Sequence, residues 1–124
     1  MILLDTSVLV GSFTGEQQSA PLLRKVIEGG ERILLPALVL YEWLRGPRLT
    51  KEIELQETLF PSESAVHFGP EEAIVTARLY RQVSRARGRE IDLAIAACAI
   101  TRDAGLWTLN QQDFRDIPGL RLTP

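Results

Sequence analysis

The first residue of this sequence that could do chemistry is an acid placed directly after an apolar run. Asp5 follows residues 1–4, which are predicted to form a buried strand. A carboxylate there is unfavourable unless positive charge meets it, and the carboxyl ends of parallel strands are where α/β proteins hold ligands. The alternative is that Asp5, with Thr6 and Ser7, only caps the next helix. Asp5 is therefore a candidate for ligand binding or catalysis.

Three more acidic residues have apolar neighbours and lie at or near the ends of predicted elements: Glu42, Asp92 and Asp113. Taken singly, they are explained as the boundary of an amphipathic helix, an N-cap and a turn residue. Together with Asp5, they would place four carboxylates at one edge of a sheet, where they repel one another unless a cation neutralises them. Hard divalent cations prefer oxygen ligands, so the sequence predicts a Mg²⁺ or Mn²⁺ site.

The residue types also limit which metal and which reaction fit. His67 and Cys98 are the single histidine and cysteine, so the chain has no ligand set for zinc. A divalent cation held by carboxylates suits hydrolysis of a phosphodiester, because it activates water and stabilises charge on the reacting oxygens. This reaction needs no protein nucleophile. One or two ions fit equally well, and Glu42 could bind directly or through water.

Composition predicts one domain over residues 1–124, because 124 residues with 45% hydrophobic side chains suffice for a single core. A lone cysteine excludes an internal disulfide and is typical of a reducing compartment. We recognise no secretory signal and no apolar run long enough to cross a membrane, so we expect a cytoplasmic protein. The net charge of −2 gives no global attraction to nucleic acid, so any such binding must be local.

Short apolar segments alternate with longer amphipathic ones and would position these acids. We expect strands at 1–4, 33–35, 65–68, 106–109 and 120–122. We expect helices at 20–27, from Pro36 to the Gly46-Pro47 stop, at 50–59, from Pro70 towards Gly88, and at 92–104, with a helical turn around 113–114. This alternation predicts an α/β fold with a mostly parallel sheet of four to five strands flanked by helices.

Four sequence blocks, in this order and spacing, are similar to those of one family: LLDTSVL at 3–9, LYEWLRG at 40–46, IDLAIAA at 91–97, and TLNQQDF at 108–114 followed by IPGL at 117–120. The chain resembles the PIN-domain family over nearly its whole length, and within it the VapC-type ribonuclease toxins of toxin-antitoxin pairs. The resemblance implies an α/β PIN domain, RNA as the substrate and a cognate antitoxin as a partner.

The resemblance also assigns site residues. It implies that Asp5, Glu42 and Asp92 carry the metal, and that Thr6 and Thr108 support the site. The position directly after Thr108-Leu109 is Asn110, where many relatives have Asp. We therefore assign Asp113, the nearest carboxylate, as the fourth acid, and Asn110 as its polar neighbour.

Two surfaces are predicted for partners. Small PIN toxins typically form homodimers through helices and are inhibited by an antitoxin segment lying over the cleft, for which apolar residues near Glu42 offer a groove: Trp43, Leu44, Leu49 and Ile53. At least half of these are expected to fill the protein's own core. RNA contact is expected from arginines near the end of the helix that starts at Pro70. Arg78, Arg81 and Arg85 are spaced to share one helix face, and Arg87 and Arg89 continue the charge.

Two rival functions remain. A catalytically degenerate PIN-like module that binds RNA or protein is supported by Asn110 and by the modest charge. A phosphatase of the haloacid-dehalogenase type also has an Asp after its first strand, but it requires a second Asp at position 7, which is Ser7 here. Titration with Mn²⁺ separates a nuclease from a scaffold, since only the nuclease binds the metal and cleaves RNA.

Overall fold

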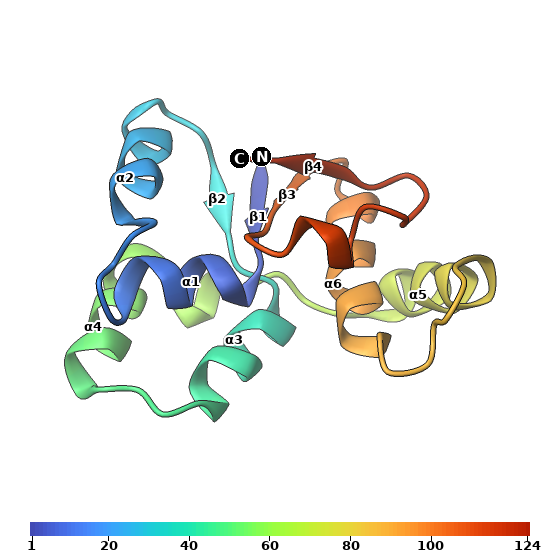
Figure 1. Cartoon of the computed structure of the whole chain (residues 1–124), viewed down its shortest axis with the longest axis horizontal. Helices are drawn as coiled ribbons and strands as arrows, with labels where there is room; N and C mark the ends of the chain where they lie inside the picture. The colour runs from blue at the N-terminus through green and yellow to red at the C-terminus, as the bar shows by residue number, and fades with distance from the viewer.

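Four short parallel strands form the centre of the protein (Figure 1). The computed structural model describes residues 1–124. The strands are β1 (Ile2–Leu4), β2 (Ile33–Leu34), β3 (Gly105–Trp107) and β4 (Arg121–Thr123), in the order β2-β1-β3-β4. Every neighbouring pair is parallel. The predicted α/β class and the four-stranded parallel sheet are therefore confirmed.

Apolar composition explains why β1 occupies an inner position. All three of its side chains are buried, as expected for a parallel strand covered on both faces. Leu4 pairs with Trp107 of β3, so the residues that follow β1 and β3 meet at one edge. From β1 the chain turns to β2 on one side and later enters β3 on the other. Ligands in open α/β sheets bind at the carboxyl edge of such a switch point.

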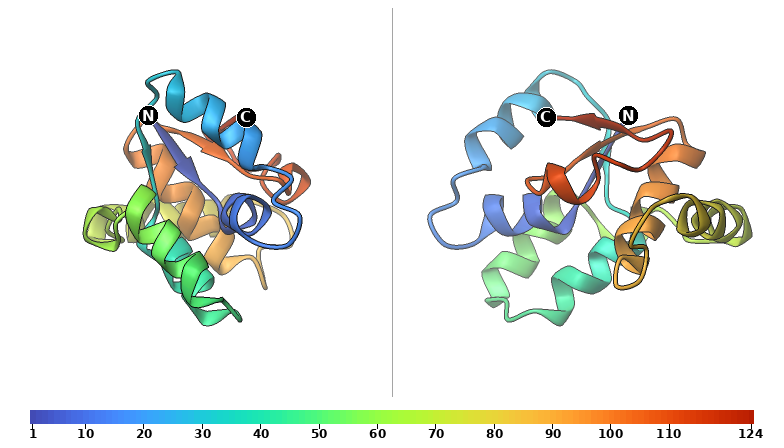
Figure 2. Two further views of the ribbon diagram at one scale, coloured as in Figure 1. Left: turned by 90° about the vertical axis from the view of Figure 1, so that its left-hand side faces the viewer. Right: turned by 45° about the vertical axis from the view of Figure 1, so that its right-hand side comes forward.

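Helices cover both faces of this sheet. They are α1 (Thr6–Phe13), α2 (Ala20–Glu28), α3 (Ala37–Arg45), α4 (Thr50–Leu59), α5 (Pro70–Gln82) and α6 (Glu90–Thr101), with short 3₁₀ turns at Ser62–Ser64 and Gln111–Asp113. Figure 2 shows α1 and α2 on one side of the sheet and α6 on the other, with α5 outside it. The residues of α6 from Leu93 to Ala99 are all buried, because small and apolar side chains let this helix pack on every side.

Four expectations about elements need correction. Residues 65–68 form no strand: Val66 makes one parallel bridge to Pro36, because the chain there already turns into α3. The helix from Pro70 ends at Gln82, since Val83 is extended and Arg85 takes a positive φ of 56°. The helix predicted at 92–104 spans Glu90–Thr101 instead. The sequence predicts helix α1 only as the next helix that Asp5 would cap and gives it no bounds, because its polar Ser12 is buried and its apolar Val10 is exposed, which blurs any amphipathic period.

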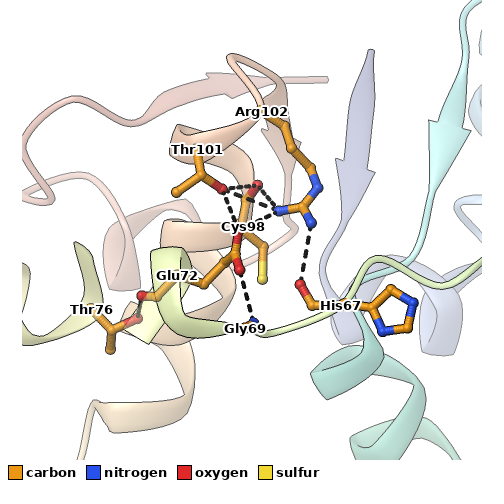
Figure 3. A network of polar contacts seen from close by, with 7 residues as sticks. All are labelled: His67, Gly69, Glu72, Thr76, Cys98, Thr101 and Arg102. Carbon is orange, nitrogen blue, oxygen red and sulfur yellow. Dashed lines mark hydrogen bonds and ion pairs between the residues drawn. The ribbon is translucent and has the colours of Figure 1, made fainter. Parts of the chain in front are cut away.

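A polar network joins α5 to the end of α6 (Figure 3). Arg102 donates to Glu72 Oε2 over 3.1 Å and to the His67 carbonyl over 3.2 Å, and Thr101 donates to the same carboxylate oxygen over 3.1 Å. The other oxygen of Glu72 accepts the Gly69 N–H over 2.8 Å. This carboxylate therefore caps the start of α5 and ties α5 to α6.

Candidate active site

A cleft of about 460 Å³ opens at the carboxyl edge of β1 and β3. Its walls include six residues that the sequence singled out: Asp5, Thr6, Glu42, Asp92, Asn110 and Asp113. They come from the end of β1, from α1, α3 and α6, and from the segment after β3. The structure therefore brings together all four predicted carboxylates, although they lie up to 108 positions apart in the sequence.

Asp5 is the most buried of these acids, with an exposed fraction of 5%. No cation of the protein pairs with it. Two hydroxyls donate to its Oδ2 atom instead, from Thr108 over 2.7 Å and from Ser7 over 2.9 Å. Because both bonds go to one oxygen, Oδ1 has no hydrogen-bond partner within the protein. This arrangement fixes the carboxylate and leaves one oxygen for a ligand.

Backbone N–H groups orient both hydroxyls. Leu109 N–H donates to Ser7 Oγ over 2.9 Å, and Asn110 N–H donates to Thr108 Oγ1 over 3.0 Å. A hydroxyl that accepts from the backbone can aim its own proton at Asp5. The sequence analysis treated Ser7 only as a cap or turn residue and so missed this contact. Its place two residues after a strand-ending Asp was the one available signal.

Glu42 reaches the cleft from α3. Its neighbours Val39 and Trp43 are buried in the core, which fixes the face of α3 that Glu42 occupies. Thr6 donates to Glu42 Oε1 over 2.6 Å, and Arg45 lies 4.0 Å from Oε2. Thr6 thus holds the Glu42 carboxylate as Thr108 holds Asp5.

Asp92 lies in the first turn of α6 and faces the other acids. Burial, and then the charges of Asp5, Glu42 and Asp113, together raise the pKa of this carboxyl to about 6 against the opposing effect of Arg89. Asp92 has no hydrogen-bond donor comparable to Thr6 or Thr108. Repulsion among the cleft acids therefore falls most strongly on this residue.

The polar side chains that line the cleft offer carboxylate, hydroxyl and amide groups, with no histidine or cysteine. This set suits a hard divalent cation and not zinc. No three of the chain's acidic, histidine or cysteine side chains are grouped closely enough here to hold a metal ion. The acids line an open cleft with repulsion unrelieved at Asp92. Their chemistry fits a divalent cation, and drawing them together around one would remove this repulsion.

The predicted arginine surface differs from the helical face that the sequence suggested. Arg78 and Arg81 lie in α5, but Arg85 lies beyond its end, so these three residues do not share one helix face. Arg85 and Arg87 are exposed. Arg89 directly precedes α6 and forms a two-bonded ion pair with Asp116.

The predicted apolar groove is only partly at the surface. Trp43 is fully buried and belongs to the core, whereas Leu44 and Leu49 are exposed and Ile53 is half-buried. Arg48 stacks on the Trp43 ring at 4.2 Å, which seals that side. A more apolar hollow of about 380 Å³ lies between α1, α2 and α4, lined by Phe13, Leu23, Ile27, Leu55 and Leu59 among others.

No helix of this structure combines the length and hydropathy that crossing a membrane requires.

Two known proteins are similar in sequence to this chain over nearly its whole length. Ribonuclease VapC19 of Mycobacterium tuberculosis is 36% identical over 123 residues, which cover 98% of each chain. Ribonuclease VapC1 of Methanocaldococcus jannaschii is 33% identical over 117 residues, covering 91% of this chain and 78% of that protein.

Solved structures share the fold. VapBC from Salmonella typhimurium bound to DNA contains a chain with a TM-score of 0.81 and 20% identity, covering 98% of this chain and 96% of that one. VapBC2 from Rickettsia felis, bound to a fragment of its promoter, gives a TM-score of 0.79 at 21% identity, covering 99% and 98%. The sequence profile of the PIN domain matches residues 2–120. This match agrees with the four acids gathered at the carboxyl edge of the parallel sheet and with the similar sequences above. The chain belongs to the PIN-domain family.

Proposed function

We propose that this protein is a ribonuclease that depends on Mg²⁺ or Mn²⁺, and that it is the toxin of a VapBC-type toxin-antitoxin pair. The gathering of four carboxylates from separate chain segments in one cleft carries this proposal. Two curated relatives that match along most of the chain are named ribonucleases. The fold neighbours from Salmonella typhimurium and Rickettsia felis belong to VapBC complexes.

Asp5, Glu42, Asp92 and Asp113 would hold the cation. When bound, it supplies activation of water and stabilisation of the charge that builds on the phosphoryl oxygens. Thr6 orients Glu42, while Thr108 and Ser7 orient Asp5 through hydrogen bonds of 2.6 to 2.9 Å. Asn110 lines the same cleft and offers an amide to the substrate or to the cation.

The cleft offers no protein nucleophile. Its hydroxyls at Thr6 and Ser7 already donate to carboxylates, and the single histidine, His67, does not line it. Attack by water is therefore the route that the residues present support.

The decisive experiment measures RNA cleavage with Mn²⁺ for Asp5→Asn and Asp92→Asn. Each variant should lose at least about 100-fold in rate, because each removes a charged ligand of the cation. Asp113→Asn should lose less. Asp103→Asn, which changes an exposed acid that does not line the cleft, should cleave as the parent does. Parent-like cleavage by Asp5→Asn would refute the proposed centre.

RNA contact is proposed for Arg85 and Arg87, which are exposed and precede α6. Changing both to Gln should weaken binding of uncleaved single-stranded RNA and flatten its dependence on salt, because phosphate contacts release counterions. Mn²⁺ affinity should stay unchanged. Parent-like affinity and salt slope would place the RNA path elsewhere.

An antitoxin partner fits the hollow between α1, α2 and α4, because Ile27, Leu55 and Leu59 in its apolar lining are exposed. The probe is the protein encoded by the neighbouring small reading frame, co-expressed with this chain. Leu55→Glu places a charge in the hollow and should abolish co-purification. Leu22→Glu is the matched control, since Leu22 on α2 is 44% exposed, close to the 40% of Leu55, but does not line the hollow.

A second candidate is a PIN-like binding module without catalysis, which Asn110 favours because many relatives carry Asp there. Such a module would bind no Mn²⁺ and cleave no RNA. Calorimetric titration of the purified protein with Mn²⁺, followed by a cleavage assay, separates the two functions.

A further inference from the structure

Arg89 joins three separate parts of the chain at the rim of the cleft. Its two terminal nitrogens donate to both carboxylate oxygens of Asp116, over 2.9 and 2.6 Å. They also donate to the Asp113 carbonyl over 3.0 Å and to the Ser84 carbonyl over 3.3 Å. A two-bonded pair of this kind is among the strongest and most directional polar contacts in proteins.

The hydrogen bonds of Arg89 lie close to two of the cleft acids. Arg89 directly precedes α6, and Asp92 lies three residues further on, in the first turn. Asp113, whose carbonyl Arg89 holds, contributes its own side chain to the cleft. One guanidinium therefore connects the segments that carry two of the four cleft acids. Phe114 and Ile117 anchor the same segment in the core, and Arg89 adds the polar contacts that tie it to the start of α6.

We propose that Arg89 is a positioning residue: by holding Asp116 and the Asp113 carbonyl against the start of α6, it sets the separation of Asp92 and Asp113 and thereby the affinity for a divalent cation. This inference rests on the proposed function, because it takes the cleft acids as the cation site. The Arg89 side chain is 21% exposed, and its terminal nitrogens make four hydrogen bonds within the protein.

The direction in which Mn²⁺ affinity changes distinguishes a positioning role of Arg89 from a purely electrostatic one. Arg89 is a cation near a cation site, so removing it should raise Mn²⁺ affinity if charge alone matters. If Arg89 positions the acids, Arg89→Gln should instead lower Mn²⁺ affinity about tenfold, as loss of a supporting contact does at metal sites. Arg89→Lys keeps the charge but loses the two-bonded geometry, and it should also lower the affinity.

Titration of the full-length protein with Mn²⁺, followed by electron paramagnetic resonance and without RNA, provides this readout. Asp116→Asn should lower the affinity as Arg89→Gln does, and the double variant should lose no more than the worse single variant, because both act through one contact. Unchanged or tighter Mn²⁺ binding by Arg89→Gln and Arg89→Lys would overturn the proposal. Where Arg89→Gln fails to fold, Arg89→Lys and Asp116→Asn decide it.

Arg102→Gln is the matched control. Arg102 also pairs with a carboxylate beside α6 (Figure 3). At a rise of about 1.5 Å per residue, Arg102 lies about 20 Å along the helix from Arg89. This variant should lose stability and keep the parent's Mn²⁺ affinity. A tenfold loss of affinity in Arg102→Gln would show that general loosening explains the effect and would overturn the proposal.

Amide hydrogen exchange keeps this inference distinct from the proposed function. A parent protein that binds no Mn²⁺ refutes the metal site, and the positioning role is then judged on the exchange of residues 110–117. Exchange there should be about tenfold faster in Arg89→Gln and parent-like in Arg102→Gln. Parent-like exchange in both variants would overturn the role of Arg89.

Discussion

At the scale of single residues, Asp92 controls how the acidic cleft responds to pH. Its carboxyl has a pKa raised to about 6, first by burial and then by Asp5, Glu42 and Asp113. Between its ordinary pKa of 3.8 and this value, the folded protein keeps a proton that the unfolded chain releases. In metal-free protein, the stability from this group is full below the ordinary pKa and is lost as pH rises through 6.

Asp92→Asn should therefore stabilise the metal-free protein at pH 7 while abolishing cleavage. We expect a gain of about 1 to 2 kcal/mol in unfolding free energy, less than the full shift implies because the side chain is partly exposed. Urea unfolding with a metal chelator present, at pH 7 and at pH 4, measures this gain in unfolding free energy. The gain should vanish at pH 4. A destabilised variant at pH 7 would show that Asp92 is held by favourable contacts instead.

The hydroxyl of Thr108 supports Asp5, and its removal should cost both stability and activity. Thr108→Val leaves Asp5 with the Ser7 donor alone and leaves the Asn110 N–H without its acceptor. Loss of such a buried contact costs about 1 to 3 kcal/mol. Urea unfolding and Mn²⁺-dependent cleavage test this together. Thr108→Ser, which retains the hydroxyl, should restore most of both, and its failure to do so would assign the loss to the methyl group.

At the scale of elements, helix α5 depends on its contact with α6. The pKa of Glu72 is lowered, first by the Gly69 N–H and then by Thr101 and Arg102, against the opposing effect of burial. Its contribution to stability is therefore present above the ordinary carboxyl pKa of 4.5 and is lost as pH falls. This dependence runs opposite to that of Asp92.

Glu72→Gln should consequently make α5 the weakest part of the fold. The amide still reaches Gly69 and Thr101 but loses the charge that pairs with Arg102. Amide exchange across α5 should accelerate at pH 7, and its difference from the parent should shrink as the pH falls below 4.5 and the parent's Glu72 loses its charge. A difference that stays constant over this pH range would argue that the loss reflects shape and not charge.

At the scale of the whole molecule, we propose that exposed apolar side chains on α3 and α5 mediate self-association. Ile74 of α5 is 72% exposed, and Tyr80 on the same helix and Tyr41 on α3 are also exposed. We expect a homodimer on size-exclusion chromatography with light scattering. Ile74→Glu should shift the protein towards monomer without changing its circular dichroism. A parent that stays monomeric at high concentration would contradict the predicted dimer.

Part of the fold and of the site is determined locally and could be predicted. The apolar run before Asp5, the alternation of strand and helix patterns, and the apolar surroundings of Glu42 and Asp92 are properties of neighbouring residues. They fixed the α/β class and selected acids that lie in one cleft. Local patterns failed where no clear amphipathic period marked a helix, as in α1, or where pairing stopped at a single bridge, as at Val66.

Tertiary structure decided the contacts between distant residues. The pairing of Leu4 with Trp107 brings Thr108 to Asp5, and the same edge brings Ser7 to Leu109 across 102 positions. Arg89 reaches Asp116 across 27 positions, although the sequence suggested RNA contact for this arginine. The sequence by itself determined which groups are chemically suited to the site. Which of them meet depends on sheet register and helix packing, which no local pattern encodes.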